Sequence, residues 1–255
     1  MEIHHSHKGH SKKNWKEHIT EFFMLFLAVS LGFLAENLRE HQIEMNRGET
    51  YLVELETDLK NDSVSLKNLA FLIENQKEAA DSIYDMYKRY NWEQHINELY
   101  FYHAIVSLRT NWEPNDATWE QAINSGTLRY LDNKELVKKL KDYYFHIKNM
   151  KNRESRILTM MDNYFEEYRQ HHFVSPSITA NKDYLVVMDI INKSSKPKMP
   201  VFTANQKILN RDKFDFETYV NSIARLQGTR NLDLNSLIFK CIDMNKALLE
   251  LLRDK

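Results

Sequence analysis

Residues Phe22–Ala35, with the sequence FFMLFLAVSLGFLA, carry no charge, whereas the residues on either side are rich in Lys, Glu, His and Arg. A helix that spans a membrane needs about 20 predominantly apolar residues, and extending this stretch to Ile19–Leu38 provides them. At about 1.5 Å per residue, the extended segment forms roughly 30 Å of helix, enough to cross the hydrocarbon layer. This stretch therefore decides whether the chain is anchored in a membrane.

Two other interpretations compete with a membrane anchor: a cleaved signal peptide and the buried helix of a soluble protein. A cleavage site after Ala35 would need a small residue at the position of Phe33, which is too large. Cleavage after Ser30 would leave too short a hydrophobic region, and no cysteine lies near enough for a lipoprotein signal. We therefore predict an uncleaved transmembrane helix at residues 19–38, with the buried helix as the alternative.

The flanking charges indicate the orientation of this helix. Four lysines precede it, and only two arginines follow it closely, among several glutamates. Because lysine and arginine accumulate on the cytoplasmic side of a membrane segment, we expect residues 1–18 to form a cytoplasmic tail rich in His and Lys. Residues 39–255 would then form an extracytoplasmic helical domain, which in a bacterium lies in the periplasm, anchored in the inner membrane.

The composition favours an all-α protein without a catalytic constellation. Only 5 Gly and 4 Pro occur among 255 residues, so few positions interrupt helices. The net charge of −1 argues against a nucleic-acid partner. The chain has no phosphate-binding loop, dinucleotide-binding turn, nucleophile elbow or CxxC motif, and the single Cys241 cannot form an intrachain disulfide. The sequence therefore predicts a non-enzymatic protein without a cofactor or a bound metal.

A stripe of apolar residues at steps of three and four runs from the apolar segment far into the rest of the chain. No proline precedes Pro114, so one helix can continue through most of this length. We place a hinge between Arg39 and Gly48, where the stripe is weak and glycine lowers helix stability. The stripe packs either within the chain's own helical bundle or in a parallel coiled coil with another copy. Its members are Met24, Leu27, Leu31, Leu34, Leu38, Leu52, Leu55, Leu59, Leu66, Leu69, Ile73, Ala80, Ile83, Tyr87 and Tyr90, with polar interruptions at His41, Asp62 and Gln76.

The remaining sequence predicts further helices and one irregular region. Helices are expected at residues 92–109, 117–125, 132–172, 215–227 and 232–253, with a loop at 110–116 and irregular structure at about 173–213. A turn at Gly228 would join the last two helices as an antiparallel hairpin. The predicted fold is all-α: an N-terminal membrane helix continues into a long helix that is packed in an extracytoplasmic antiparallel helical bundle.

Two segments of the chain, Glu49–Asp62 (ETYLVELETDLKND) and Thr118–Tyr144 (TWEQAINSGTLRYLDNKELVKKLKDYY), resemble an uncharacterised family of single-pass membrane proteins common in Bacteroidota. The similarity covers roughly residues 15–170, and the stretch Ser125–Leu136 is its most specific part. The resemblance implies an inner-membrane anchor and a helical periplasmic domain. It implies no particular activity and no catalytic residues.

Three residues of this motif are candidates for a structural or interaction role. Gly126 is expected to end one helix in the left-handed conformation. Asp132 is expected to cap the next helix, in a D-x-x-E capping box with Glu135. Arg129 is the functional candidate among them, with a salt bridge to a neighbouring helix as its alternative role.

Other polar and aromatic residues allow further hypotheses. Glu21, at the edge of the membrane helix, is either an interfacial group or an ionisable site in an ion pathway. The histidines of the N-terminal tail either chelate a metal or belong to a disordered segment. Several aromatic residues either line a ligand groove or pack in the core. The tail histidines are His4, His5, His7 and His10, and the aromatic residues considered for a groove are Trp92, Tyr100, Tyr102, Trp112 and Trp119.

These features predict a membrane-anchored protein that contacts protein partners as a scaffold, a sensor or an accessory subunit of a membrane complex. One alternative is a stator-like or accessory subunit of an ion-driven transport or motor complex that uses Glu21. Another is a ligand-binding module with an aromatic groove. The expected partners are the lipid bilayer, other proteins and, as one alternative, further copies of the chain.

Overall fold

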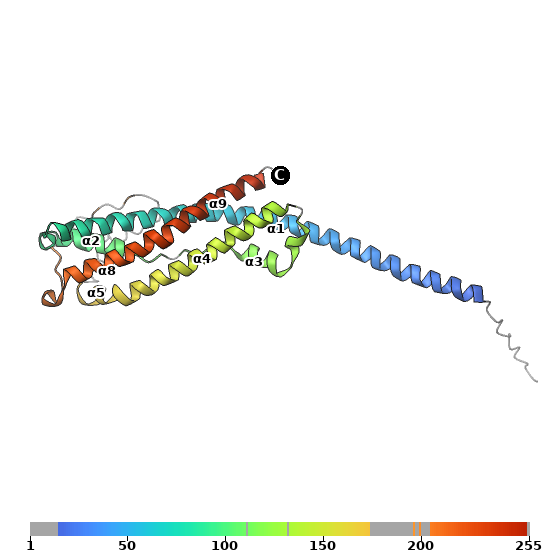
Figure 1. The fold of residues 1–255 in the computed structure, drawn as a ribbon, viewed down its shortest axis with the longest axis horizontal. Helices are drawn as coiled ribbons and strands as arrows, with labels where there is room; N and C mark the ends of the chain where they lie inside the picture. Colours follow the sequence, from blue (N-terminus) through green and yellow to red (C-terminus); the bar gives the residue numbers. More distant parts are fainter. Residues whose placement is uncertain are drawn as a thin grey trace, which may run out of the picture.

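The computed structural model describes residues 15–110, 112–131, 133–173, 196, 199 and 205–253. This part of the chain is all-α and contains no β-strand, as the composition predicts. Figure 1 shows one long helix, α1 (Trp15–Lys88), whose N-terminal half stands free while other helices pack along its C-terminal half. We call the packed part, residues 48–253, the helical body. The free half includes a segment that is long and apolar enough to span a membrane.

The helical body is built from α1 and six further described helices. They are α2 (Ile96–Val106), α3 (Ala117–Asn124), α4 (Lys134–Tyr164), α5 (Glu166–His171), α8 (Phe216–Thr229) and α9 (Ser236–Arg253). Between them lie the short 3₁₀ helices η1 (Trp92–Gln94), η2 (Thr127–Tyr130) and η3 (Arg211–Lys213), and the π-helix η4 (Arg230–Asn235). α1 contacts α2, α3, α8 and α9, and α4 contacts α8 and α9.

Hydrogen bonds to α1 show how the chain folds back along it. Gln76, in the distal part of α1, donates from Nε2 to the carbonyl oxygen of Leu108 (2.8 Å). Asn245, late in α9, donates from Nδ2 to the carbonyl oxygen of Leu59, which lies nearer the free half (2.8 Å). At the far end of α1, the Tyr87 ring lies 6.3 Å from the ring of Phe216, the first residue of α8. α8 and α9 therefore run antiparallel to α1, and the C-terminus lies near the point where α1 enters the helical body (Figure 1).

α1 runs without a break through residues 39–48, so the predicted hinge is wrong. Gly48 is buried where η2 meets the helix. A Cβ atom added to it would lie 3.0 Å from Cδ2 of Leu131 and 3.6 Å from Cγ2 of Thr127. The glycine therefore allows another part of the chain to approach α1 closely, and this packing supports the helix where its own apolar stripe is weak.

Enlarging Gly48 is expected to push η2 away from α1. The substitution Gly48→Leu should lower the free energy of unfolding by about 1–3 kcal/mol, the usual cost of overpacking. Gly48→Ala should change it far less, because a gain of about 0.5–1 kcal/mol in helix stability offsets the pressure on Leu131. Denaturation of the full chain in detergent, followed by far-UV circular dichroism, measures both values.

The matched control for this prediction is Gly228→Ala. No atom lies within 4 Å of the Cβ position of this helical glycine, so the substitution should stabilise the fold slightly. Wild-type stability of Gly48→Leu would show that η2 does not lie tightly on α1.

Within the helical body, other helices of the same chain bury the predicted stripe. Leu55, Leu59, Leu66, Ile73 and Ile83 are completely buried, on a helix that α2, α8 and α9 contact. A coiled coil with a second copy through these residues would require α2, α8 and α9 to separate from α1. In the apolar segment, by contrast, Leu27, Leu31 and the other large side chains of the stripe are uncovered.

The stripe ends earlier than predicted, because α1 stops at Lys88. Tyr90 has a φ of +53° and is 88% exposed. Its backbone N–H donates to the carbonyl oxygen of Tyr87 (3.1 Å), and the N–H of Asn91 donates to that of Met86 (3.3 Å). This pair of bonds is a Schellman motif, which ends a helix by a residue in the left-handed conformation.

The predicted hairpin at the C-terminus is also wrong. α8, η4 and α9 follow one another without a turn, and Gly228 lies inside α8. The π-helical segment holds Arg230 and Leu234 in the interior, with 1% and 0% of each residue exposed. A wider helical turn changes the angular position of the residues that follow it. The apolar residues of α8 and those of α9 therefore follow different helical phases in the sequence, although the backbone is continuous.

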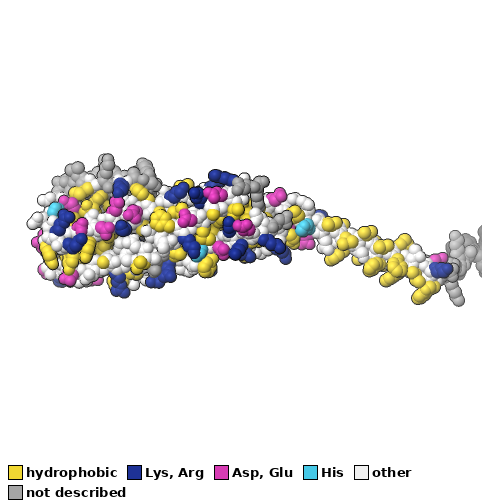
Figure 2. All heavy atoms as spheres, turned by 45° about the horizontal axis from the view of Figure 1, so that its top comes forward, with side chains coloured by type: hydrophobic (Ala, Val, Ile, Leu, Met, Phe, Trp, Pro, Cys, Tyr) yellow, Lys and Arg dark blue, Asp and Glu magenta, His cyan; other side chains and the backbone are white. Residues whose placement is uncertain are grey.

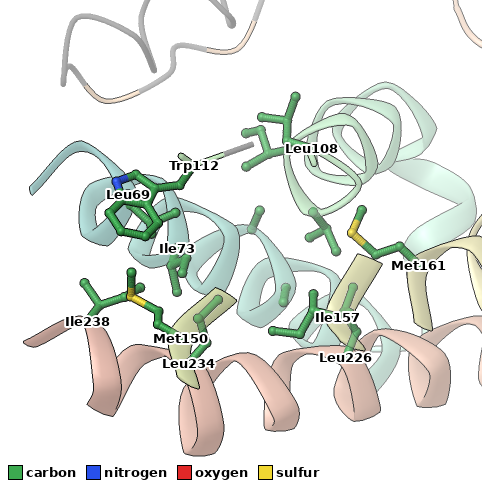
Figure 3. Packing of buried hydrophobic residues seen from close by; sticks show 14 of the residues in the cluster. Leu69, Ile73, Leu108, Trp112, Met150, Ile157, Met161, Leu226, Leu234 and Ile238 are labelled. Carbon is green, nitrogen blue, oxygen red and sulfur yellow. The ribbon is translucent and has the colours of Figure 1, made fainter. Parts of the chain in front are cut away.

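Figure 3 shows that side chains from α1, α4 and the α8–α9 run meet in one core. Met150 and Ile157 of α4 point toward Leu234 and Leu226, and Trp112 lies beside Leu69 of α1. The helix predicted at residues 132–172 is divided between α4 and α5 at Phe165, whose side chain is buried in the same core.

Candidate functional site

The apolar segment of α1 is not covered by the helical body, and Figure 2 shows its hydrophobic side chains on the surface of the free half. The exposed fractions are 63% for Phe22, 69% for Leu25 and 71% for Leu38. An exposed apolar surface of this extent indicates contact with lipid or with another protein. Glu21 lies at its N-terminal edge, with Oε2 3.9 Å from Nδ1 of His18.

Just beyond the apolar segment, η2 packs against α1. The Thr127 hydroxyl donates to Oε2 of Glu44 (2.9 Å), and the Tyr130 ring lies edge-on to the His41 ring, with 5.6 Å between the ring centres. We call this contact between residues 41–48 and 126–131 the α1–η2 junction. It joins the most specific part of the sequence motif to the base of the free helix.

The structure places Gly126 and Arg129 in this junction. Gly126 has a φ of +72° and follows the end of α3, so the predicted left-handed helix end is confirmed. The Arg129 guanidinium lies over the Tyr130 ring, 5.1 Å from its centre. The predicted salt bridge of Arg129 has no partner among the described residues.

Asp132 lies outside the described residues. The N-cap of α4 is Asn133, one residue later than predicted, because its Oδ1 accepts the backbone N–H of Leu136 (2.9 Å). The side-chain oxygens of Asn and Asp cap helices equally well. Sequence alone therefore could not distinguish the two adjacent candidates.

The five aromatic residues considered for a ligand groove do not line a common groove. Trp112 is buried and donates from Nε1 to the Ser65 hydroxyl (2.9 Å), and Trp92 stacks on Phe216 with 4.8 Å between centres. Trp119 stacks on Tyr144 beside an open hollow of about 460 Å³. The other two are also separated: Tyr100 is buried, and Tyr102 lines a different, smaller hollow of about 250 Å³.

A buried polar cluster ties α1 to the helices around it. Asp62 is fully buried. Its Oδ1 accepts from the backbone N–H and the side-chain amide of Asn115 (3.0 and 2.8 Å), and its Oδ2 accepts from the Tyr143 hydroxyl (2.8 Å). The same hydroxyl lies 3.5 Å from Nδ2 of Asn245 in α9. We call these four residues the Asp62 cluster.

Burial sets the protonation of this cluster. Desolvation raises the pKa of Asp62 above its ordinary value, and the three hydrogen bonds only partly oppose this effect. Burial also raises the pKa of the Tyr143 hydroxyl and brings that of the nearby Cys241 thiol to about 12. At neutral pH the Tyr143 hydroxyl and the Cys241 thiol keep their protons, so neither acts as a nucleophile in this environment.

A second buried group surrounds His103. Its ring stacks on Phe173 with 3.8 Å between centres, and its Nδ1 lies 2.8 Å from the Tyr219 hydroxyl. Nε2 is buried without a hydrogen-bond partner among the described residues. Desolvation lowers the pKa of His103 to about 3, with a smaller contribution from the positive charge of Arg169.

His103 is expected to make the fold sensitive to acid. Its pKa is lowered in the folded state, so its contribution to stability is complete above the ordinary value of about 6.5 and is lost as the pH falls toward 3. Replacement by Gln should remove this part of the pH dependence. Denaturation of the wild type and His103→Gln between pH 7 and 4 tests this expectation, and parallel pH profiles would contradict it.

Arg230 is a buried cation held by backbone dipoles. Its guanidinium donates to the carbonyl oxygens of Val106 (3.0 Å) and Leu108 (3.4 Å), at the C-terminal end of α2. No carboxylate in the described part of the chain pairs with it, and burial lowers its pKa to about 9. The negative end of a helix dipole stabilises such a cation. Arg230 therefore caps α2 and fixes the π-helical segment against it.

The described residues contain no group of three or more His, Cys, Asp or Glu side chains that could hold a metal. The four tail histidines, His4, His5, His7 and His10, lie outside those residues. Asp62, Gln76 and Arg230 form their hydrogen bonds in the interior, to other side chains or to the backbone. The sequence showed Asp62 and Gln76 as interruptions of the stripe, but their partners lie far along the chain and were missed.

No protein family matches the chain, and no curated protein or solved structure matches it either.

Proposed function

We propose that the protein is a single-pass anchor that holds a helical bundle at the extracytoplasmic face of a bacterial inner membrane, as a scaffold or accessory subunit for protein partners. The continuity of α1 carries this proposal. One unbroken helix contains both the uncovered apolar segment and the buried residues of the body core. A movement of the membrane segment would therefore reach the body directly, as expected for a subunit that links events in and above a membrane.

The exposed apolar side chains support a membrane location. Water contact by so many large apolar groups on one segment would be unfavourable, and lipid removes it. The lysines before the segment support a cytoplasmic N-terminus. The bulk of the chain would then lie in the periplasm.

Cysteine labelling tests the orientation, because the single natural cysteine is buried. Lys16→Cys and Lys88→Cys place a thiol at the two ends of α1, both on exposed positions. A membrane-impermeant maleimide should label Lys88→Cys in cells with a permeabilised outer membrane, and Lys16→Cys only after lysis. The reverse pattern would overturn the proposed orientation.

Affinity purification from solubilised membranes, with mass spectrometry, tests the proposed role. Specific proteins should co-purify with the full chain and be lost when the periplasmic body is removed by protease from spheroplasts. Purification of partner-free monomers would contradict a scaffold role.

A stator-like role through Glu21 is the second candidate. Glu21 lies at the cytoplasmic edge of the proposed span, with its side chain 49% exposed toward whatever surrounds the helix. An ionisable group at this place can serve an ion pathway when a second membrane protein covers it. Glu21→Gln should then abolish the activity of the associated ion-driven complex, and unchanged activity would remove this candidate.

A further inference from the structure

We infer that a groove beside the N-terminal half of α4 binds an amphipathic helix of a protein partner, through an acidic flank and an apolar face of that helix. This inference rests on the proposed scaffold role and names the kind of segment that the scaffold would hold. It is carried by a row of exposed lysines and one exposed aromatic ring on α4, next to two hollows with apolar lining.

The outward-facing row of α4 is basic and continuous. Its members follow one another at alternating steps of four and three residues, so they lie on one side of the helix. All of them are exposed, and none is Asp or Glu. The row extends over about 27 Å of helix. We call it the α4 ridge, and it consists of Lys134, Lys138, Lys141, Phe145, Lys148 and Asn152.

The four lysines of the α4 ridge are available to a partner, because none of them forms an ion pair with a described residue. By contrast, Lys139 and Lys151 of the same helix pair with Glu135 and Glu113. Like charges three or four residues apart on a helix repel one another. Carboxylates of a partner at matching spacing would remove this repulsion, so the ridge is complementary to an acidic flank.

The first hollow lies between the ridge and η2. Its volume is about 430 Å³, and the side chains of Leu128, Leu131 and Val137 give it an aliphatic lining. Arg129 adds a further cation to the three ridge lysines that border it, and its described lining contains no Asp or Glu. This end of the groove therefore combines an apolar floor with positive charge.

The second hollow lies between the ridge and α3, and Lys141 borders both hollows, so they form one groove. Its volume is about 460 Å³, and the Trp119 and Tyr144 rings stack on each other in its wall. Phe145 on the ridge and Ile123 on α3 are 60% and 43% exposed at its rim. An apolar face of a partner helix would cover these two side chains.

The charges of the second hollow determine which flank of the partner is acidic. Three acids lie in its α3 half and the loop before it, namely Glu113, Asp116 and Glu120. The cations lie on α4. A helix in the groove would therefore place its carboxylates over the α4 ridge and a neutral or basic flank over α3. The groove thus selects a helix with one acidic flank, not a uniformly acidic chain.

The contacts of the groove with α1 place it in the aqueous compartment. Leu131 lies against Gly48, and Tyr143, next to the second hollow, donates to Asp62. These two residues of α1 follow Leu38 by 10 and 24 positions, which correspond to about 15 and 36 Å of helix. The headgroup layer is only roughly 5–7 Å thick. The groove therefore meets water-soluble segments, and its helical spacing matches a helix that docks in a groove.

Fluorescence anisotropy with the full chain in neutral-lipid nanodiscs tests the inference. The probe is a labelled helical peptide of about 21 residues, long enough to cover the ridge, with leucine along one face, glutamate along one flank and glutamine along the other. Its counterpart carries lysine in place of each glutamate. We expect the acidic peptide to bind at least about tenfold more tightly than the basic one, because only the acidic flank complements the ridge.

Two variants of the chain locate the binding. Lys134→Gln, Lys138→Gln, Lys141→Gln and Lys148→Gln together should weaken binding of the acidic peptide at least about tenfold. Ile123→Ser with Phe145→Ser leaves all charges in place and should weaken it by a similar factor. The control removes four exposed cations that do not border the groove, by Lys67→Gln, Lys207→Gln, Lys213→Gln and Lys246→Gln, and should bind as the wild type does.

Several outcomes would overturn the inference. Equal binding of the two peptides, or wild-type binding by the four-lysine variant, would show that the ridge does not recognise an acidic flank. Polyglutamate bound as tightly as the amphipathic peptide would reduce the site to charge alone. Displacement of the peptide by dextran sulfate at equal affinity would assign the groove to an anionic glycan. Dimerisation of the chain that the four-lysine variant abolishes would assign it to a second copy.

The proposed scaffold role is tested apart from the groove, by the proteins that co-purify from solubilised membranes. Co-purification that the four-lysine variant leaves unchanged would refute the groove and keep the scaffold role. Partner-free monomers would contradict the scaffold role and, with it, this inference.

Discussion

The double substitution Leu27→Arg with Leu31→Arg is expected to remove the protein from the membrane fraction. Both residues lie near the middle of the proposed span, where each arginine disfavours insertion by about 2.5–3.5 kcal/mol. Together they oppose insertion by roughly 5–7 kcal/mol, more than a marginally apolar segment of this length supplies. Carbonate extraction followed by immunoblotting measures the retained fraction.

The same helix offers a matched control. Val53 and Val64 are exposed aliphatic residues of α1 outside the apolar segment, 66% and 62% exposed. Val53→Arg with Val64→Arg adds the same charge to the same helix, and this variant should stay in the membrane. Membrane retention of the Leu27 and Leu31 double variant would show that this segment is not the anchor.

Asp62→Ala is expected to give the largest loss of stability in the helical body. The substitution leaves the buried Tyr143 hydroxyl and two N–H groups of the partly buried Asn115 without their acceptor. Each group left without a partner costs about 1–3 kcal/mol when fully buried, so three groups cost roughly 3–9 kcal/mol. Because Asn115 is only partly buried, we expect a loss near the lower end, roughly 3–5 kcal/mol. Asp62→Asn keeps one acceptor oxygen and should cost less. Denaturation of the full chain in detergent ranks the two variants, and equal losses would contradict the role given to the carboxylate.

The pH dependence of the same site has a defined sign. The folded state raises the pKa of Asp62, so it favours the protonated carboxyl. The contribution of Asp62 to stability is therefore complete below its ordinary pKa and is lost as the pH rises through the raised value. Asp62→Asn should lack this decline. His103 acts with the opposite sign, so the two profiles are separated only by studying each variant alone.

Local patterns predicted the features that depend on local chemistry. The length of α1 follows from the absence of proline before Pro114 and from apolar spacing, and both are visible in the sequence. The end of α3 at Gly126 follows from the freedom of glycine in the left-handed region. The burial of the stripe residues between Leu55 and Ile83 follows from helical periodicity, and the structure buries them within one chain.

The errors arose where distant contacts decide the outcome. Gly48 suggested a hinge because its partner, Leu131, lies far along the chain. Gly228 suggested a turn because the π-helix shifts the apolar face, and the buried contacts of Arg230 that accompany the shift join it to the end of α2. Asp62 appeared as a polar interruption of the stripe, although its carboxylate accepts three hydrogen bonds in the folded chain. Spacing along one helix contains no information about such partners.

Because α1 is unbroken through residues 39–48, its length also fixes the rotation of the apolar segment about the helix axis relative to the helical body. Each residue of an α-helix turns the chain by about 100°. One residue inserted between Arg39 and Glu40 would therefore turn the apolar segment to present a different face to its surroundings, while the body kept its own orientation. Seven inserted residues would restore the original bearing to within about 20°. The number of residues between the apolar segment and the helical body thus specifies which face of the apolar segment is presented to a neighbour.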